Sequence, residues 1–82
     1  LWGKSENLFN SKKWKEAIVS YQEYRTKYPK GKNWGDATYK IGVSFQELGL
    51  KSDARAFYQE VIDKKAKTKA AKKAAYRLKN LK

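Results

Sequence analysis

The chain has 82 residues, a formal net charge of +12, and neither cysteine nor histidine. This length allows one small domain, and the missing residue types exclude disulfides, thiolate or imidazole metal ligands, and nucleophiles activated by histidine. The eight carboxylates are scattered without the spacing of an acid–base pair or a hard-metal loop, so we expect no enzyme, no cofactor and no metal site.

Residues 1–31 predict a helix, a turn near residues 11–13 and a second helix that opens at Trp14. The buried face of the second helix is expected to carry Ala17, Tyr21, Tyr24 and Tyr28. Pro29 ends this helix, because proline disfavours helical backbone at the preceding residue and has no N–H to donate. A loop over residues 29–35 follows.

Residues 35–66 predict a second pair of helices, joined by a turn at residues 49–52. One face of the first helix carries Ala37, Ile41, Phe45 and Leu48, at spacings of four, four and three. Gly49 is a typical stop after such a helix. The stripe of the next helix consists of Ala54, Tyr58, Val61 and Ile62.

Residues 69–81 predict a final helix after a turn at residues 64–68, with Ala74, Leu78 and Leu81 on one side. This helix would cap the second unit, because the last apolar face of a stack otherwise meets water. Alternation of the strand type is absent. We therefore predict an all-α single domain over residues 1–82.

A shift of 37 residues aligns the two units. Residues 17–23 (AIVSYQE) fall on residues 54–60 (ARAFYQE), and the same shift pairs Ala37 with Ala74 and Tyr39 with Tyr76. A fixed period of this size is the signature of stacked helical hairpins.

These residues resemble the tetratricopeptide repeat pattern. Ala17, Tyr21 and Pro29 fall where that pattern has Ala, Phe and Pro, and Ile41, Gly42, Phe45, Ala54 and Tyr58 fall where it has Leu, Gly, Tyr, Ala and Phe. The departures are Thr38 for tryptophan, Tyr24 and Val61 for a small residue, Ala66 for the closing proline, and Lys12 for the glycine that ends the first helix. The resemblance implies a right-handed α-solenoid fragment that binds proteins and catalyses nothing.

In tetratricopeptide stacks the first helix of each unit lines a concave groove. The matching positions here, our predicted partner-binding groove, are Trp2, Glu6, Phe9, Tyr39, Val43, Gln46 and Tyr76. Trp2, Tyr39 and Tyr76 are equivalent and lie one residue off the packing stripe, so we expect them to anchor a peptide or helix. The alternative is that packing in a larger assembly covers them.

A narrower similarity extends over nearly the whole chain. Residues 37–42, 54–62 and 70–78, with Tyr28-Pro29, are similar to the C-terminal domain of the YbgF/CpoB family of the Tol-Pal system. It implies a periplasmic protein that coordinates outer-membrane constriction in cell division, with TolA or a cell-wall synthesis component as partner. A signal peptide and a trimeric coiled coil are expected upstream of Leu1. Outer-membrane assembly lipoproteins of the BamD type stay an alternative.

Basic charge is concentrated in residues 64–82, which carry nine basic and no acidic side chains. The predicted basic patch consists of Lys65, Lys67, Lys69, Lys72 and Lys73. As an alternative function, it would bind an anionic polymer such as cell wall, lipid or nucleic acid. Nucleic acid is the least favoured of these, because no recognised binding motif is present. A purely structural segment of a longer solenoid is a third alternative.

Overall fold

The computed structural model describes residues 1–81; Lys82, which we assigned to the domain, lies outside the described residues. Residues 1–81 form five helices and no strand, which confirms the all-α prediction. The helices are α1 (Trp2–Asn10), α2 (Trp14–Lys27), α3 (Trp34–Glu47), α4 (Lys51–Lys64) and α5 (Lys69–Asn80).

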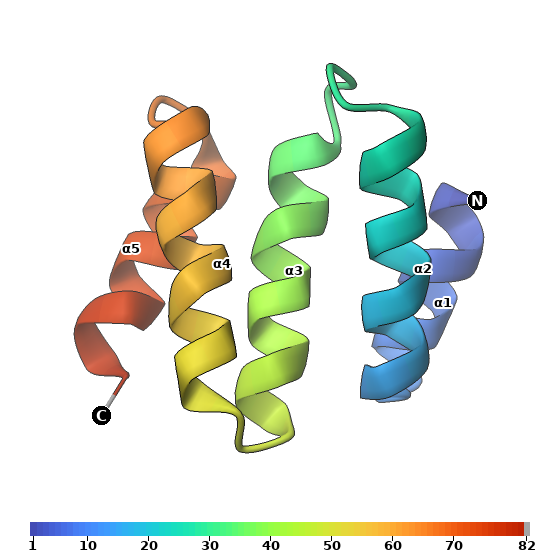
Figure 1. Ribbon diagram of the computed structural model, residues 1–82, viewed down its shortest axis with the longest axis horizontal. Coiled ribbons are helices and arrows are strands. Elements are labelled where there is room, and N and C mark those ends of the chain that lie inside the picture. The colour runs from blue at the N-terminus through green and yellow to red at the C-terminus, as the bar shows by residue number, and fades with distance from the viewer. Residues whose placement is uncertain (82) are drawn as a thin grey trace.

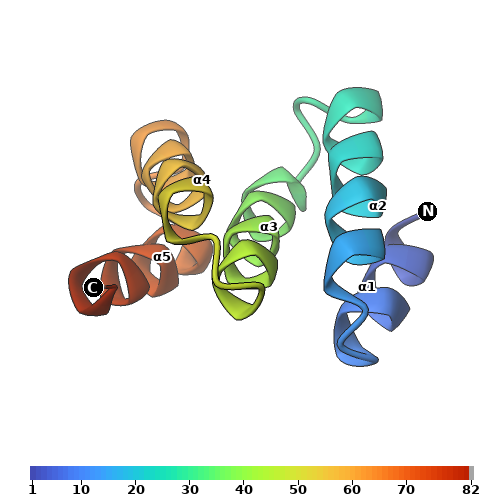
Figure 2. The ribbon, with the colours of Figure 1, turned by 60° about the horizontal axis from the view of Figure 1, so that its bottom comes forward.

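Successive helices pack against each other as antiparallel neighbours. In Figure 1, α2, α3 and α4 stand in a row, with α1 behind α2 and α5 behind α4. The turned view in Figure 2 keeps α1 with α2 at one end and α5 with α4 at the other. The molecule is therefore a short stack of two hairpins, α1–α2 and α3–α4, closed by α5, with principal extents of 30 × 27 × 16 Å.

Both hairpins turn through a left-handed residue at the same place in the repeat. Gly49, after α3, has φ of +81°, and Lys12, after α1, has φ of 61°. Glycine adopts this conformation freely, whereas a side chain makes it unfavourable. The departure from the family pattern at Lys12 is therefore a change of residue and not of backbone.

The interiors of the two hairpins are equivalent, as the repeat predicts. Ala17 and Ala54 are both fully buried, and so are Tyr21 and Tyr58. Gly42 brings α3 and α4 close together, since a Cβ at this position would lie 2.6 Å from Cε1 of Tyr58. Small residues at these crossings thus set the spacing within a hairpin.

Two contacts join the elements into one stack. On one side, Ala17, Tyr21 and Tyr24 of α2 form a core cluster with Ala37 and Ile41 of α3. On the other side, α5 covers the second hairpin. Its cluster consists of Ala70, Ala74 and Leu81 with Tyr39, Val43, Ala54, Tyr58 and Val61. Residues 69–80 therefore act as the predicted cap.

Two details differ from the sequence prediction. Tyr28 is 45% exposed and does not belong to the buried face of α2. It follows the last residue of α2 and has φ −128° and ψ 64°, so Pro29 has already turned its backbone out of the helix. The loop predicted over residues 29–35 also ends earlier, because α3 begins at Trp34, which is 6% exposed.

Candidate functional site

The predicted groove residues come from α1, α3 and α5, which are neighbours along one side of the stack. Lys40 of α3 forms an ion pair with Glu6 of α1 at 2.8 Å, and Tyr39 of α3 packs in the cluster of α5. The structure therefore brings the three first helices together. Most of the predicted groove residues on these helices pack against other side chains, and Tyr76 is exposed.

Trp2, Glu6 and Phe9 of α1 are half-buried and contact both α2 and α3. The Trp2 ring lies 4.9 Å from that of Tyr24 between centroids, and the Phe9 ring lies 5.4 Å from that of Trp14. Each ring therefore offers a partner only part of its surface.

Glu6 joins three helices. Its carboxylate accepts hydrogen bonds from the hydroxyl of Tyr21 on α2 and from Nζ of Lys40 on α3. Burial raises the pKa of Tyr21, and the bond to Glu6 raises it further. Burial lowers the pKa of Lys40, but Glu6 and Asp36 outweigh this effect, so its pKa is raised. Tyr21 therefore stays neutral and Lys40 charged near neutral pH, and the network ties α1, α2 and α3 together.

Tyr39 and Val43 of α3 are core residues in this chain, with 9% and 5% exposure. The Tyr39 ring lies 5.9 Å from that of Tyr58. Our interpretation that Tyr39 lies off the packing stripe is corrected, because α5 extends the buried surface to it. Gln46 is half-buried and accepts a hydrogen bond from the hydroxyl of Tyr58 at 2.6 Å.

Tyr76 of α5 is the exposed member of the predicted groove, at 72%. It borders a shallow hollow of about 420 Å³ between α3 and α5, which we call the inner hollow. The hollow is lined by Tyr39, Lys72, Lys73, Tyr76 and Arg77. An exposed aromatic ring beside three cations suits an acidic or carboxylate-bearing ligand.

The predicted basic patch is split between two places. Lys65, Lys69 and Lys73 line a second hollow, of about 490 Å³, together with Lys30 and Lys32 from the loop between α2 and α3. We call it the lysine hollow. Lys73 borders the inner hollow as well, Lys72 borders only the inner hollow, and Lys67 borders neither. Sequence reasoning missed Lys30 and Lys32, since only the fold brings their loop beside α5.

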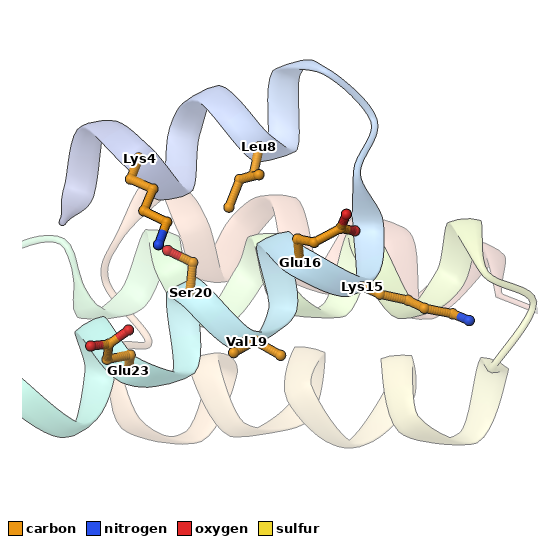
Figure 3. Close-up of a pocket in the computed structure, with 7 residues that line it drawn as sticks. All are labelled: Lys4, Leu8, Lys15, Glu16, Val19, Ser20 and Glu23. Atoms are coloured by element: carbon orange, nitrogen blue, oxygen red, sulfur yellow. The ribbon is translucent and has the colours of Figure 1, made fainter.

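A third hollow lies between α1 and α2 and was not predicted. It measures about 390 Å³, and we call it the α1–α2 cleft. Figure 3 shows Leu8 pointing from α1 toward α2, with Lys4 reaching toward Ser20. The cleft is lined by Lys4, Leu8, Lys15, Glu16, Val19, Ser20 and Glu23. The feature of the sequence that could have indicated this cleft is Val19, an apolar residue outside the buried stripe of α2. Its side chain is 69% exposed.

Among residues 1–81, no three carboxylate, imidazole or thiol side chains gather where they could hold a metal ion. No helix in this range has the length and apolarity that crossing a membrane requires. The hollows described above are lined by aromatic, apolar, basic and acidic side chains.

Comparison with protein-family models gives a match to the tetratricopeptide repeat family. The model of the tetratricopeptide repeat family covers residues 1–31 and 36–68, which correspond to the two hairpins with their flanking turns. A comparison with curated proteins gave no match. Tetratricopeptide repeats are generally non-catalytic modules for protein–protein interaction, built as stacked helical pairs. The chain belongs to the tetratricopeptide repeat family.

Proposed function

We propose that this chain binds a protein partner through the inner hollow and catalyses no reaction. The observation that carries the proposal is Tyr76, which is 72% exposed beside the buried Tyr39. Exposed aromatic rings at the edge of a hollow are frequent anchors of protein interfaces, because they bury a large area with few rotatable bonds.

The charges of the inner hollow define the partner further. Lys72, Lys73 and Arg77 surround Tyr76, and no carboxylate lines this hollow in the described part of the chain. A partner segment with an apolar residue on Tyr76 and acidic residues on either side would complement it. A short acidic peptide or helix fits this description.

For the biological setting, we propose the periplasm and the Tol-Pal system. The support is the similarity of residues 37–42, 54–62 and 70–78 to the YbgF/CpoB family. The partner would then be TolA or another Tol-Pal or cell-wall synthesis component, and the role would be coordination of outer-membrane constriction in cell division. A BamD-like role in outer-membrane assembly is the alternative within the same fold.

The test is a calorimetric titration of the full chain with the periplasmic part of TolA. Replacing Tyr76 by alanine should weaken binding at least about tenfold without changing the thermal melt, since the side chain is exposed. Leu50→Ala is the control, because Leu50 is 47% exposed but lies in the turn between α3 and α4. Equal affinity of the Tyr76→Ala variant and the wild type would reject the inner hollow as the site.

The lysine hollow supports a second candidate function, the binding of an anionic polymer. Five lysines line it against one carboxylate, that of Asp36, and Asp36 already lies 3.4 Å from Lys40. Retention on a polyphosphate matrix should fall steeply with salt and should be lost in a Lys30→Glu, Lys69→Glu variant. Lys67→Glu, Lys72→Glu changes the net charge equally outside the hollow. Equal effects of the two pairs would indicate only general charge attraction.

A further inference from the structure

The α1–α2 cleft has an occupied counterpart within the same molecule. The 37-residue shift carries α1 onto α3 and α2 onto α4. The residues that line the cleft then fall on Ile41, Phe45, Ser52, Asp53, Ala56, Phe57 and Glu60. In the second hairpin α2 covers the part of this face around Ile41, Phe57 and Glu60, whereas Ser52, Asp53 and Ala56 stay exposed.

The contacts of α2 show how a helix sits on this face. Ile41 is fully buried in the cluster that Tyr21 and Tyr24 of α2 complete. Nη2 of Arg25 donates to Oε2 of Glu60 at 2.6 Å, and the guanidinium lies 5.3 Å from the centroid of the Phe57 ring. Tyr21, Tyr24 and Arg25 of α2 therefore cover the part of the face around Ile41, Phe57 and Glu60.

The first hairpin keeps part of this recognition surface. Glu23 stands where Glu60 stands, and Leu8 stands where Phe45 stands. Among residues 1–81 Glu23 is exposed and has no ion pair, whereas Glu60 binds Arg25. The acidic position that receives an arginine in one hairpin is thus open to solvent in the other.

Two other positions differ in a way that keeps the face stable in water. Lys4 replaces Ile41, and Ser20 replaces Phe57, which leaves the room of a phenyl ring to the cleft. Ser20 is satisfied by a hydrogen bond with Ser5 at 2.5 Å. A face of this mixed character tolerates solvent and still offers Leu8 and Val19 to a ligand. These substitutions favour reversible over permanent occupation.

We propose that the α1–α2 cleft binds an amphipathic helix of a partner protein in the way that α2 covers the second hairpin. The helix would place an apolar residue against Leu8, the counterpart of Phe45, and an arginine one turn later against Glu23. The spacing follows Tyr21 and Arg25 of α2, which lie four residues apart on one face. The proposal rests on the protein-binding function but uses a surface separate from the inner hollow.

The experiment uses the full chain and a fluorescein-labelled peptide of residues 14–28, which carries the stripe of α2 and Arg25. Fluorescence anisotropy should show saturable binding. Replacing Glu23 by arginine in the chain should weaken it about tenfold, as expected for a charge-assisted hydrogen bond. A peptide with Arg25→Glu should bind this variant and not the wild type. Glu47→Arg, a charge change on an exposed residue of α3 outside the cleft, should leave the affinity of the original peptide unchanged.

Amide chemical shifts identify where the peptide binds. Shifts at Leu8, Val19 and Ser20 would support the cleft. Shifts at Phe45 and Phe57 would show that the peptide displaces α2 and would overturn the proposal. Absence of peptide binding, or an equal effect of Glu23→Arg and Glu47→Arg on the affinity, would also overturn the proposal. A concentration-dependent dimer that Glu23→Arg disrupts would overturn it too, because the occupant of the cleft would then be a second copy of the chain.

The outcome is independent of the test on the inner hollow. If Tyr76→Ala abolishes binding of TolA and Glu23→Arg leaves the peptide affinity unchanged, the cleft proposal fails alone. If the peptide binds in the cleft and Tyr76→Ala has no effect on TolA, the inner hollow fails and the cleft stands.

Discussion

Replacement of Gly42 by alanine tests how the helices of the second hairpin are spaced. A Cβ at this position would lie 2.6 Å from Cε1 and 2.7 Å from Cδ1 of Tyr58. The Tyr58 ring is fully buried. Its hydroxyl donates to Oε1 of Gln46 at 2.6 Å, and its face meets the Tyr39 ring. The ring therefore cannot rotate away without losing other contacts.

The magnitude follows from two opposing effects. Restoring ordinary contact near 3.4 Å requires an opening of about 0.8 Å between α3 and the ring, and overpacking of a filled core costs about 1–3 kcal/mol. Alanine regains roughly 1 kcal/mol of helix propensity over glycine. We expect a net loss of about 0–2 kcal/mol in the free energy of unfolding, or a fall in Tm of up to roughly 15 °C for a domain of this size.

Urea unfolding followed by far-UV circular dichroism measures this loss. Gly3→Ala is the matched control, because nothing lies within 4 Å of a Cβ at Gly3 in the first turn of α1. It should be neutral or stabilising by up to about 1 kcal/mol. If Gly42→Ala is as stable as Gly3→Ala, the close approach of α3 and α4 does not determine the packing, and our account of the hairpin is refuted.

Three further predictions concern single interactions. Lys12→Gly should stabilise the chain by about 1 kcal/mol, since φ of 61° strains a side-chain-bearing residue, and an unchanged urea midpoint would contradict this. Arg25→Lys should cost about 1–3 kcal/mol, because lysine cannot reproduce both the bond to Glu60 and the stacking on the neighbouring rings; a double-mutant cycle with Glu60→Gln should show the coupling. Burial raises the pKa of Tyr58 to about 12, above an unfolded value near 10. The contribution of this pKa difference to the free energy of unfolding is complete below about pH 10 and is lost as the pH rises through about 12. Urea unfolding at a series of alkaline pH values should therefore show a smaller loss of unfolding free energy for Tyr58→Phe than for the wild type.

The fold was accessible from the sequence because the repeat and the helical periodicity agree with each other. Ala17 and Ala54 mark the buried crossing of each hairpin, and the 37-residue shift that pairs them also pairs the left-handed positions Lys12 and Gly49. The helical periodicity is a local signal, within one or two helical turns, and the 37-residue shift compares each hairpin only with its neighbour. Local signals are sufficient when neighbouring helices pack only on neighbouring helices.

The sites were less accessible, because they depend on which side chains of distant segments meet. Arg25 lies among polar residues of α2, and nothing in its surroundings in the sequence indicates that its side chain is 12% exposed and bonded to Glu60. Tyr39 has the periodicity of a groove residue but is covered by α5. Lys30 and Lys32 meet Lys69 only after the chain has stacked.

The differences between the two hairpins separate packing from recognition. Some positions at the interior of each hairpin keep the same residue, as Tyr21 and Tyr58 do, and others stay uncharged, as Tyr24 and Val61 do. Positions on the outer face change in kind, with Lys4 for Ile41 and Ser20 for Phe57, although the backbone that carries them is repeated. A face under permanent cover gains from apolar side chains at every such position, whereas a face that also meets water gains from polar ones. The retained acid at Glu23 then has no role in the packing of its own hairpin, and an incoming arginine is the partner that its counterpart Glu60 already has.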